Sequence, residues 1–219
     1  MVKYPEVGSV KSRLAKSIGS EAATDLYRAF ILDTLSTLHA LEIPFHIAIF
    51  PPATQDRFIE WLGRSYQVFG QNGADLGERL HNGFMTMFEE KYEQVIALAS
   101  DSPGLPIDIL SKAASSLRSQ NAVLGPALDG GYYLIGFSRD TYIPSAFEGI
   151  SWGTEAVFRE TLSQLKSISN RVHILPKWMD IDTETDLRKF YEAYQMQPST
   201  APRTLSYIRS HPDILGAHS

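Results

Sequence analysis

The stretch Gln94-Val95-Ile96-Ala97-Leu98-Ala99-Ser100-Asp101-Ser102-Pro103 decides the fold class. Its apolar run over 94–99 is short and ends at polar residues and a proline, which is typical of a buried strand. A helical pattern of apolar residues precedes this run over 76–92, and another follows it over 107–117. Because parallel neighbours in a sheet need a crossover, usually a helix, this order predicts a parallel sheet.

The same alternation continues in both directions. We expect further helices over 20–41, 55–62, 155–166 and 183–194, and further strands over 45–50, 66–69, around Val123, over 132–136 and over 172–175. This order predicts an α/β fold, with a mostly parallel sheet and helices on both faces. The domain is expected to span residues 1–195. Residues 196–219 are expected to form a C-terminal tail with one weak helical pattern over 204–210, wandering over the surface or docking loosely.

The composition excludes several classes of protein. With 219 residues, 43% hydrophobic and 21% charged, the chain resembles an average globular protein and not a disordered or fibrous one. It has no cysteine, which fits a reducing compartment and leaves only oxygen or imidazole ligands for a metal. The formal net charge of −5 disfavours a nucleic-acid partner or an anionic membrane surface. Apolar runs are too short for a membrane span and no signal segment opens the chain, so a cytoplasmic protein is predicted.

Acidic side chains directly follow two of the predicted strands. Asp101 comes after the run at 94–99, and Pro103 favours an extended exit that leaves its carboxylate at the strand end. Asp180 and Asp182 lie one residue apart, so an extended backbone turns both carboxylates to one side, where they suit a hard cation such as magnesium. The structural alternative for Asp101 is a turn residue. For the second pair it is a helix N-cap at Asp182 or Thr183, where Thr183-x-x-Asp186 is a variant of the capping box.

The N-terminal segment is the basic part of an acidic chain. Over residues 1–16 the lysine and arginine side chains outnumber a single glutamate, and Gly8 precedes Lys11 and Arg13. Val10 stands where a P-loop needs glycine, so the segment is not a P-loop. It can still cradle a polyphosphate through its cations, and a solvated basic face is the alternative.

Two further motifs have both a structural and a functional interpretation. Asp129-Gly130-Gly131 is chiefly a hairpin signal, although its glycines also let a ligand approach the backbone. Asp75 opens a helix as an N-cap would, and Gln71 just before it is placed to read a base edge. The histidines lack the spacing of zinc ligands, which argues against a zinc site.

Together and in this order, the motifs resemble those of the cofactor-F420-guanylyltransferase-like glycosyltransferase family (DUF2064-type) of the nucleotide-diphosphosugar transferase, or glycosyltransferase A, superfamily. The resemblance covers nearly all of residues 3–190. It rests on Lys3-x-Pro5-x-x-Gly8-x-Val10-Lys11-Ser12-Arg13-Leu14, Gln71-x-Gly73-x-Asp75-Leu76-Gly77-Glu78-Arg79, Ser100-Asp101-Ser102-Pro103-x-Leu105-Pro106, Gly125-Pro126-x-x-Asp129-Gly130-Gly131-Tyr132-Tyr133, Ile150-x-Trp152 and Asp180-x-Asp182-Thr183-x-x-Asp186-Leu187.

The resemblance implies a Rossmann-like three-layer α/β/α sandwich with a mostly parallel mixed sheet. It also implies a bound nucleoside triphosphate or nucleotide sugar with Mg²⁺ or Mn²⁺. The implied metal ligands are Asp101, Asp180 and Asp182, and the implied catalytic residues are Asp101, Lys11 and Arg13. The implied nucleotide and phosphate contacts are Lys3, Gly8, Lys11, Arg13, Gln71 and Asp75. Acceptor or sugar contacts are expected from Asp129, Gly130, Gly131 and Trp152.

These roles predict a transferase that needs no protein nucleophile and takes a small-molecule acceptor. Nucleotidyl transfer and glycosyl transfer fit equally well. The alternatives are a haloacid-dehalogenase-like phosphohydrolase using Asp180 and Asp182, whose motif normally follows the first strand, and a catalytically silent nucleotide-binding module. A homo-oligomer is compatible with the sequence.

The start of the chain departs from the family pattern. Family members usually carry a central apolar strand just before the basic loop, where this chain has Met1-Val2. Without that strand the neighbouring strands would keep unpaired backbone groups. We therefore expect either a natural start upstream of Met1 or a partner strand that the sheet recruits.

Overall fold

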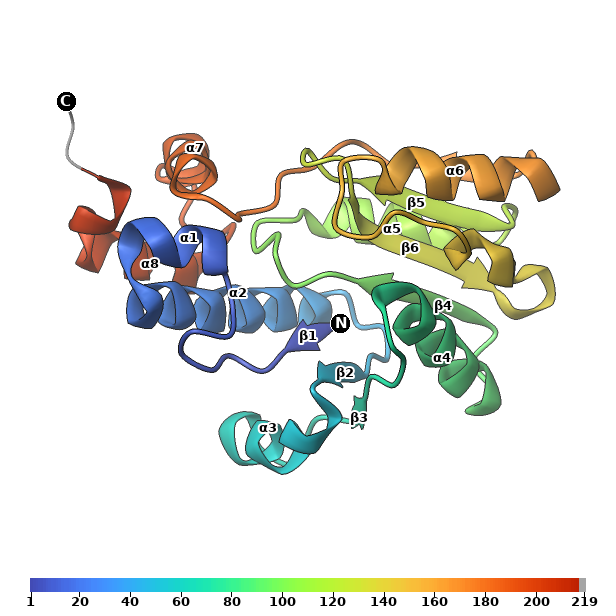
Figure 1. Cartoon of the computed structure of the whole chain (residues 1–219), viewed down its shortest axis with the longest axis horizontal. Helices are drawn as coiled ribbons and strands as arrows, with labels where there is room; N and C mark the ends of the chain where they lie inside the picture. Colours follow the sequence, from blue (N-terminus) through green and yellow to red (C-terminus); the bar gives the residue numbers. More distant parts are fainter. Residues whose placement is uncertain (217–219) are drawn as a thin grey trace.

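The computed structural model describes residues 1–216, in which strands and helices alternate along the chain (Figure 1). Four strands form a mixed group in the order β4-β6-β5-β7, and three form a parallel group in the order β1-β2-β3. Their bounds are β1 (Val2–Lys3), β2 (Ile47–Phe50), β3 (Val68–Gly70), β4 (Gln94–Leu98), β5 (Ala122–Pro126), β6 (Tyr132–Ser138) and β7 (Val172–Ile174). Strand β6 runs antiparallel to β4 and β5, whereas β7 is parallel to β5.

The helices alternate with these strands. They are α1 (Ser12–Ile18), α2 (Ser20–Ala40), α3 (Gln55–Leu62), α4 (Leu76–Glu89), α5 (Ile107–Ser116), α6 (Val157–Ile168), α7 (Glu184–Tyr194) and α8 (Pro202–Ser210). The expected α/β class is confirmed, and the expected strands are present with their ends shifted by a few residues. Helix α1 was not expected, because it is only 7 residues long and buries Leu14 alone.

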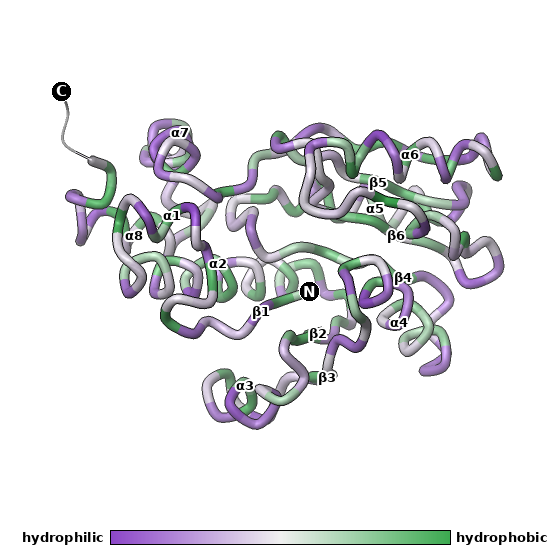
Figure 2. Tube along the Cα trace, in the orientation of Figure 1, coloured by the Kyte–Doolittle hydropathy of each residue, from purple (hydrophilic) through white to green (hydrophobic). Residues whose placement is uncertain are grey.

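Helices cover both faces of the larger strand group. On one face, Leu124 and Ile135 pack with residues of α4 and with Leu165 of α6. On the other face, Val123 and Leu134 pack with residues of α5. Apolar residues are concentrated along these strands (Figure 2). The strands lie between α4 and α6 on one face and α5 on the other. This is the three-layer arrangement that the sequence predicts.

The C-terminal segment packs more firmly than the sequence suggests. In α8, Leu205 and Ile208 are fully buried in the cluster that also contains α2 and α7. The buried Asp33 of α2 accepts hydrogen bonds from the backbone amides of Arg203 (3.1 Å) and Thr204 (2.8 Å) at the start of α8. The expectation of a loose tail is therefore wrong for residues 202–210, because a buried carboxylate caps this helix.

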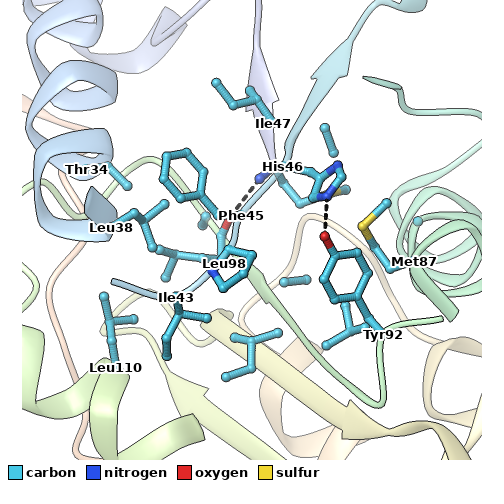
Figure 3. Close-up of a pocket in the computed structure, with 18 of the residues that line it drawn as sticks. Thr34, Leu38, Ile43, Phe45, His46, Ile47, Met87, Tyr92, Leu98 and Leu110 are labelled. Atoms are coloured by element: carbon cyan, nitrogen blue, oxygen red, sulfur yellow. Dashed lines mark hydrogen bonds between the residues drawn. The ribbon is translucent and has the colours of Figure 1, made fainter. Parts of the chain in front are cut away.

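A partly enclosed apolar slot of about 360 Å³ lies between β2 and β4 (Figure 3). Strand β2 pairs with β1 at Ile49 and Phe50, and its preceding residues Ile47 and Ala48 line the slot. Strand β4 pairs with β6 along one edge and lines the slot along its length. His46 and Tyr92 also line the slot, where the imidazole and the tyrosine hydroxyl are hydrogen-bonded over 3.0 Å (Figure 3).

The start of the chain also lines the slot, through Met1 and Val2. Val2 pairs with Ile49 of β2, while the amino group of Met1 donates to the backbone oxygen of Leu98 in β4 over 2.9 Å. The start of the chain thus contacts both strand groups, β2 through Val2 and β4 through Met1.

No helix within residues 1–216 combines the length and the apolar character that a membrane crossing requires.

Candidate functional site

The candidate site lies where the carboxyl ends of several strands meet. Asp101 follows β4, Asp129 follows β5, and Asp180 and Asp182 follow β7. The basic loop after β1 leads to Lys11, which immediately precedes α1. Ligands of open α/β sheets bind at this edge, so the topology brings the predicted acidic and basic residues to the expected place.

Lys11 is the centre of the polar network. Its ammonium donates to the Asp182 carboxylate over 2.9 Å and to the backbone oxygen of Ile181 over 2.8 Å, and it forms an ion pair with Asp101. The side chain is only 4% exposed, and its charge lies 5.6 Å from the ring centres of Tyr27 and Phe30. The predicted convergence of Asp101 and Asp182 is observed, but the cation between them is Lys11.

The backbone at Lys11 is left-handed, with φ of 49° and ψ of 45°. A residue with a Cβ adopts this region rarely, because its side chain crowds the following carbonyl group. Such conformations persist where the surrounding structure fixes them, and here the contacts of the buried Lys11 ammonium with Asp101, Asp182 and Ile181 supply that restraint.

Arg13 approaches the same carboxylate from the solvent side. Its guanidinium forms an ion pair with Asp182, while the side chain remains 60% exposed. A guanidinium has five N–H donors, so the group keeps donors for a further anion. Of the two cations Lys11 and Arg13, Arg13 is therefore the one that solvent and a ligand can reach.

A second acidic group lies beside this network. One carboxylate oxygen from each of Asp129, Asp180 and Asp182 lies within 4.8 Å of the others. The sequence predicts a set of Asp101, Asp180 and Asp182, but the structure places Asp129 in this group and pairs Asp101 with Lys11. Three convergent carboxylates match the oxygen ligands that Mg²⁺ or Mn²⁺ prefers.

The two acidic residues after β7 differ in electrostatic environment. Burial, followed by the charges of Asp129 and Asp182, raises the pKa of Asp180 to about 6. Burial would also raise the pKa of Asp182, but the charges of Lys11 and Arg13 outweigh it and lower that pKa. For Lys11, the two carboxylates outweigh burial and raise the pKa. The charges of Asp129 and Asp182 thus still repel the carboxylate of Asp180, and a cation bound among the three would relieve this repulsion.

The predicted hairpin at Asp129-Gly130-Gly131 connects β5 to β6. The Asp129 carboxylate accepts from the backbone amide of Gly131 over 2.8 Å, which is an Asx-type turn. Gly130 has a φ of +92°, and a Cβ there would lie 2.4 Å from the backbone oxygen of Glu155. The turn therefore needs glycine for packing, and it places Asp129 in the acidic group.

The basic loop is held by its own contacts. Lys3 donates to the backbone oxygen of Ser9 over 2.5 Å, which closes the loop around Gly8, and Gly8 adopts a φ of +81°. Lys3 thus stabilises the loop in this structure, while its side chain lies at the surface.

Gln71 and Asp75 have structural partners. The Gln71 amide is buried and donates to the backbone oxygens of Ala48 (2.7 Å) and Val2 (3.3 Å), so it joins β1 to β2. The Asp75 carboxylate accepts from the backbone amide of Glu78 over 2.9 Å and is the N-cap of α4. The Asp75 contact favours its interpretation as a helix N-cap. The Gln71 contacts use the side-chain amide nitrogen as a donor to two backbone oxygens.

Trp152 packs beside the start of α4. A Cβ at Gly77 would lie 2.9 Å from the indole nitrogen of Trp152, and the indole ring meets Tyr132 edge-on at 6.4 Å. Thr183 and Asp186 form the predicted capping box of α7. Because Thr183 caps the helix, the Asp182 carboxylate remains available to Lys11 and Arg13.

Sequence reasoning missed Tyr27 as part of the site. Its hydroxyl hydrogen-bonds with Ser100 over 2.8 Å and accepts from the backbone amide of Lys3 over 3.2 Å. Burial, and then the charge of Asp101, raises the pKa of Tyr27 to about 12. In the sequence this tyrosine is simply one member of the apolar face of α2, so its pattern predicts a core residue and no more.

The fold is an α/β fold of the nucleotide-diphospho-sugar transferase type. The chain belongs to the DUF2064 family, described as an uncharacterized protein conserved in bacteria, whose model matches residues 34–154. The crystal structure of a candidate nucleotide-diphospho-sugar transferase from Desulfovibrio desulfuricans G20 is similar over 98% of this chain and 94% of its own. The two share 36% sequence identity with a TM-score of 0.93.

A more distant structure shares the fold alone. It is a homolog of Mycobacterium tuberculosis rv0371c from Mycobacterium sp. strain JC1, with 14% identity and a TM-score of 0.50 over 84% of this chain and 92% of its own. None of the curated proteins matches the chain in sequence.

Proposed function

We propose that the chain is a transferase that uses a nucleotide-diphosphate sugar as donor and a small hydroxyl compound as acceptor. The observation that carries this proposal is the meeting of an exposed cation, Arg13, with three convergent carboxylates at the carboxyl edge of the sheet. A diphosphate needs positive charge at both of its phosphates. The similarity to the Desulfovibrio protein supports the same class of substrate.

The proposed metal ligands are Asp129, Asp180 and Asp182. The chemistry of the donor set fits Mg²⁺ or Mn²⁺, because every donor is an oxygen atom. Burial, followed by the charges of Asp129 and Asp182, also raises the pKa of Asp180, and a cation would offset both effects. A divalent cation held there supplies charge neutralisation for phosphate oxygens. Asp101 stays outside this set through its ion pair with Lys11.

In the proposed reaction, the oxygen of an acceptor hydroxyl forms a bond to the anomeric carbon of the sugar. The bond between that carbon and the diphosphate oxygen breaks, and the hydroxyl proton passes to solvent. Arg13 binds the leaving nucleoside diphosphate and stabilises its developing charge. Gly130 and Gly131 lie beside Asp129 at the same edge, and we assign acceptor or sugar contacts to this turn.

The phosphohydrolase alternative is less favoured. That mechanism needs a free aspartate nucleophile, whereas Asp182 is bound by Lys11 and Arg13 and Asp180 belongs to the acidic group. Both residues also follow β7, far along the chain from the first strand.

The test is product analysis with a panel of nucleotide sugars, candidate acceptor alcohols and Mn²⁺. Release of nucleoside diphosphate that requires both acceptor and cation is expected. Arg13→Ala should lower kcat/KM at least ~10-fold, corresponding to a lost charge-assisted contact. Arg118→Ala is the matched control, since Arg118 is exposed just after α5, near the opposite edge of the sheet. Pyrophosphate release from nucleoside triphosphates would instead indicate nucleotidyl transfer, and inorganic phosphate release would favour the hydrolase.

A further inference from the structure

Three protein oxygen atoms surround the Lys11 ammonium. The Asp182 carboxylate and the backbone oxygen of Ile181 accept hydrogen bonds from it, and the Asp101 carboxylate forms an ion pair with it. These three oxygen partners equal in number the three N–H groups of a lysine ammonium. A phosphate would therefore have to displace one of these partners to bind Lys11.

The Lys11 side chain is also almost fully buried. The side chain is 4% exposed, and its charge lies against the faces of Tyr27 and Phe30. Arg13 differs from Lys11 in both respects, because its side chain is 60% exposed and its ion pair is with Asp182. The two cations of the basic loop therefore differ in what they can reach.

We propose that Lys11 is a positioning residue rather than a phosphate ligand: it is an internal cation that fills the space between Asp101 and Asp182, where a second divalent ion would otherwise bind. This inference rests on the proposed function for the ligand class, and it assigns phosphate contact to Arg13. Lys11 joins the loops after β1, β4 and β7, so it fixes the Asp182 carboxylate at the edge of the acidic group.

The first test counts bound Mn²⁺ by electron paramagnetic resonance titration. The wild-type chain should bind one ion, at Asp129, Asp180 and Asp182. Lys11→Met keeps the length of the side chain and removes its charge, so Asp101 and Asp182 should take up a second ion. Lys11→Met combined with Asp101→Asn should return the count to one. Arg13→Met is the matched control and should also bind one ion.

The second test measures the affinity for inorganic pyrophosphate in the presence of Mn²⁺. The double variant Lys11→Met, Asp101→Asn has the same net charge as the wild type and avoids an unpaired buried carboxylate. It should bind pyrophosphate within about twofold of the wild type, whereas Arg13→Met should lose at least ~10-fold. This variant keeps the inference testable if Lys11→Met alone fails to fold.

Two results would overturn the inference: an unchanged ion count in folded Lys11→Met, or a loss of pyrophosphate affinity in the double variant as large as that in Arg13→Met. Failure of the proposed function looks different. If the wild type binds no Mn²⁺ but Lys11→Met binds one ion, Lys11 is the internal cation, and only the proposed metal site at Asp129, Asp180 and Asp182 is wrong.

Discussion

The ammonium of Lys11 lies 2.9 Å from the carboxylate of Asp182, 171 positions further along the chain. This contact joins the loop that precedes α1 to the loop that precedes α7. It couples the basic segment to the acidic residues after the last strand, so the two halves of the candidate site are fixed relative to each other. Asp101 completes the arrangement from the end of β4.

Asp180→Asn should stabilise the cation-free protein at neutral pH. The pKa of Asp180 is raised from 3.8 to about 6, so the folded state holds this proton more tightly than the unfolded state does. The free energy of unfolding therefore falls as the pH rises from about 4 to 7. Because Asp180 is partly exposed, solvent screening reduces the effect, and we expect a gain of about 1 kcal/mol for the variant at pH 7.5.

Urea denaturation with a chelator present measures this effect. The stabilising difference should shrink as the pH falls below about 6 and disappear below about pH 3.8, where both states hold the proton. Mn²⁺ should stabilise the wild type at pH 7.5 but not Asp180→Asn. Glu89→Gln, an exposed substitution at the end of α4, is the control and should leave the pH profile unchanged. Equal stability of Asp180→Asn and wild type at pH 7.5 would contradict the prediction.

Asp33→Ala should destabilise the protein by about 2–3 kcal/mol, because it leaves the first backbone amides of α8 without their buried acceptor. The free energy of unfolding in urea measures the loss. Asp25 lies on the same helix with its side chain half exposed, so Asp25→Ala is the control. It should lower the free energy of unfolding by less than about 0.5 kcal/mol. A similar small loss for both variants would show that the cap contributes little.

Gly130→Ala should destabilise the protein by roughly 3 kcal/mol and weaken Mn²⁺ binding. The new Cβ would meet the backbone of Glu155 at 2.4 Å, in addition to the strain of a positive φ. Gly153 also has a positive φ but has no atom within 4 Å of an added Cβ, so Gly153→Ala isolates the strain at about 1 kcal/mol. Calorimetric melting and Mn²⁺ titration distinguish the two variants; equal effects would exclude the steric cause.

An apolar extension before Met1 should raise the melting temperature. A five-residue extension rich in valine and isoleucine can lie in the slot between β2 and β4, pairing with both strands and filling apolar space. A glycine-serine extension of equal length is the control and should have no effect. If both extensions melt at the same temperature as the unextended chain, the slot does not accept a strand in this way.

The alternation of short apolar runs with helical patterns was sufficient to predict the class of fold. The run at 94–99 became β4, and its polar exit placed Asp101 at the edge of the sheet. Local signals also gave the N-cap at Asp75 and the capping box at Thr183. In each case, residues close together in the sequence determine the result.

Contacts between distant segments were not predictable in the same way. The sequence placed Asp101 with Asp180 and Asp182, but which carboxylates meet depends on the strand order β4-β6-β5-β7, which brings the loop after β5 next to the loop after β7. The enclosure of the Lys11 ammonium depends in part on the backbone oxygen of Ile181, which has no signal in the sequence. The core position of α8 depends on Asp33, which looks like an ordinary helical aspartate.

The cap that joins Asp33 to α8 also has a consequence for synthesis of the chain on the ribosome. The acceptor lies in α2, near the start of translation, while its donors at Arg203 and Thr204 emerge 170 residues later. Until these residues are synthesised, the Asp33 carboxylate lacks the amides that it binds in the folded protein, and α8 does not yet cover the apolar face of α2. The nascent chain must therefore keep this helix soluble for most of its synthesis, and a product that stops before Pro202 would expose that face as a target for chaperones and proteases.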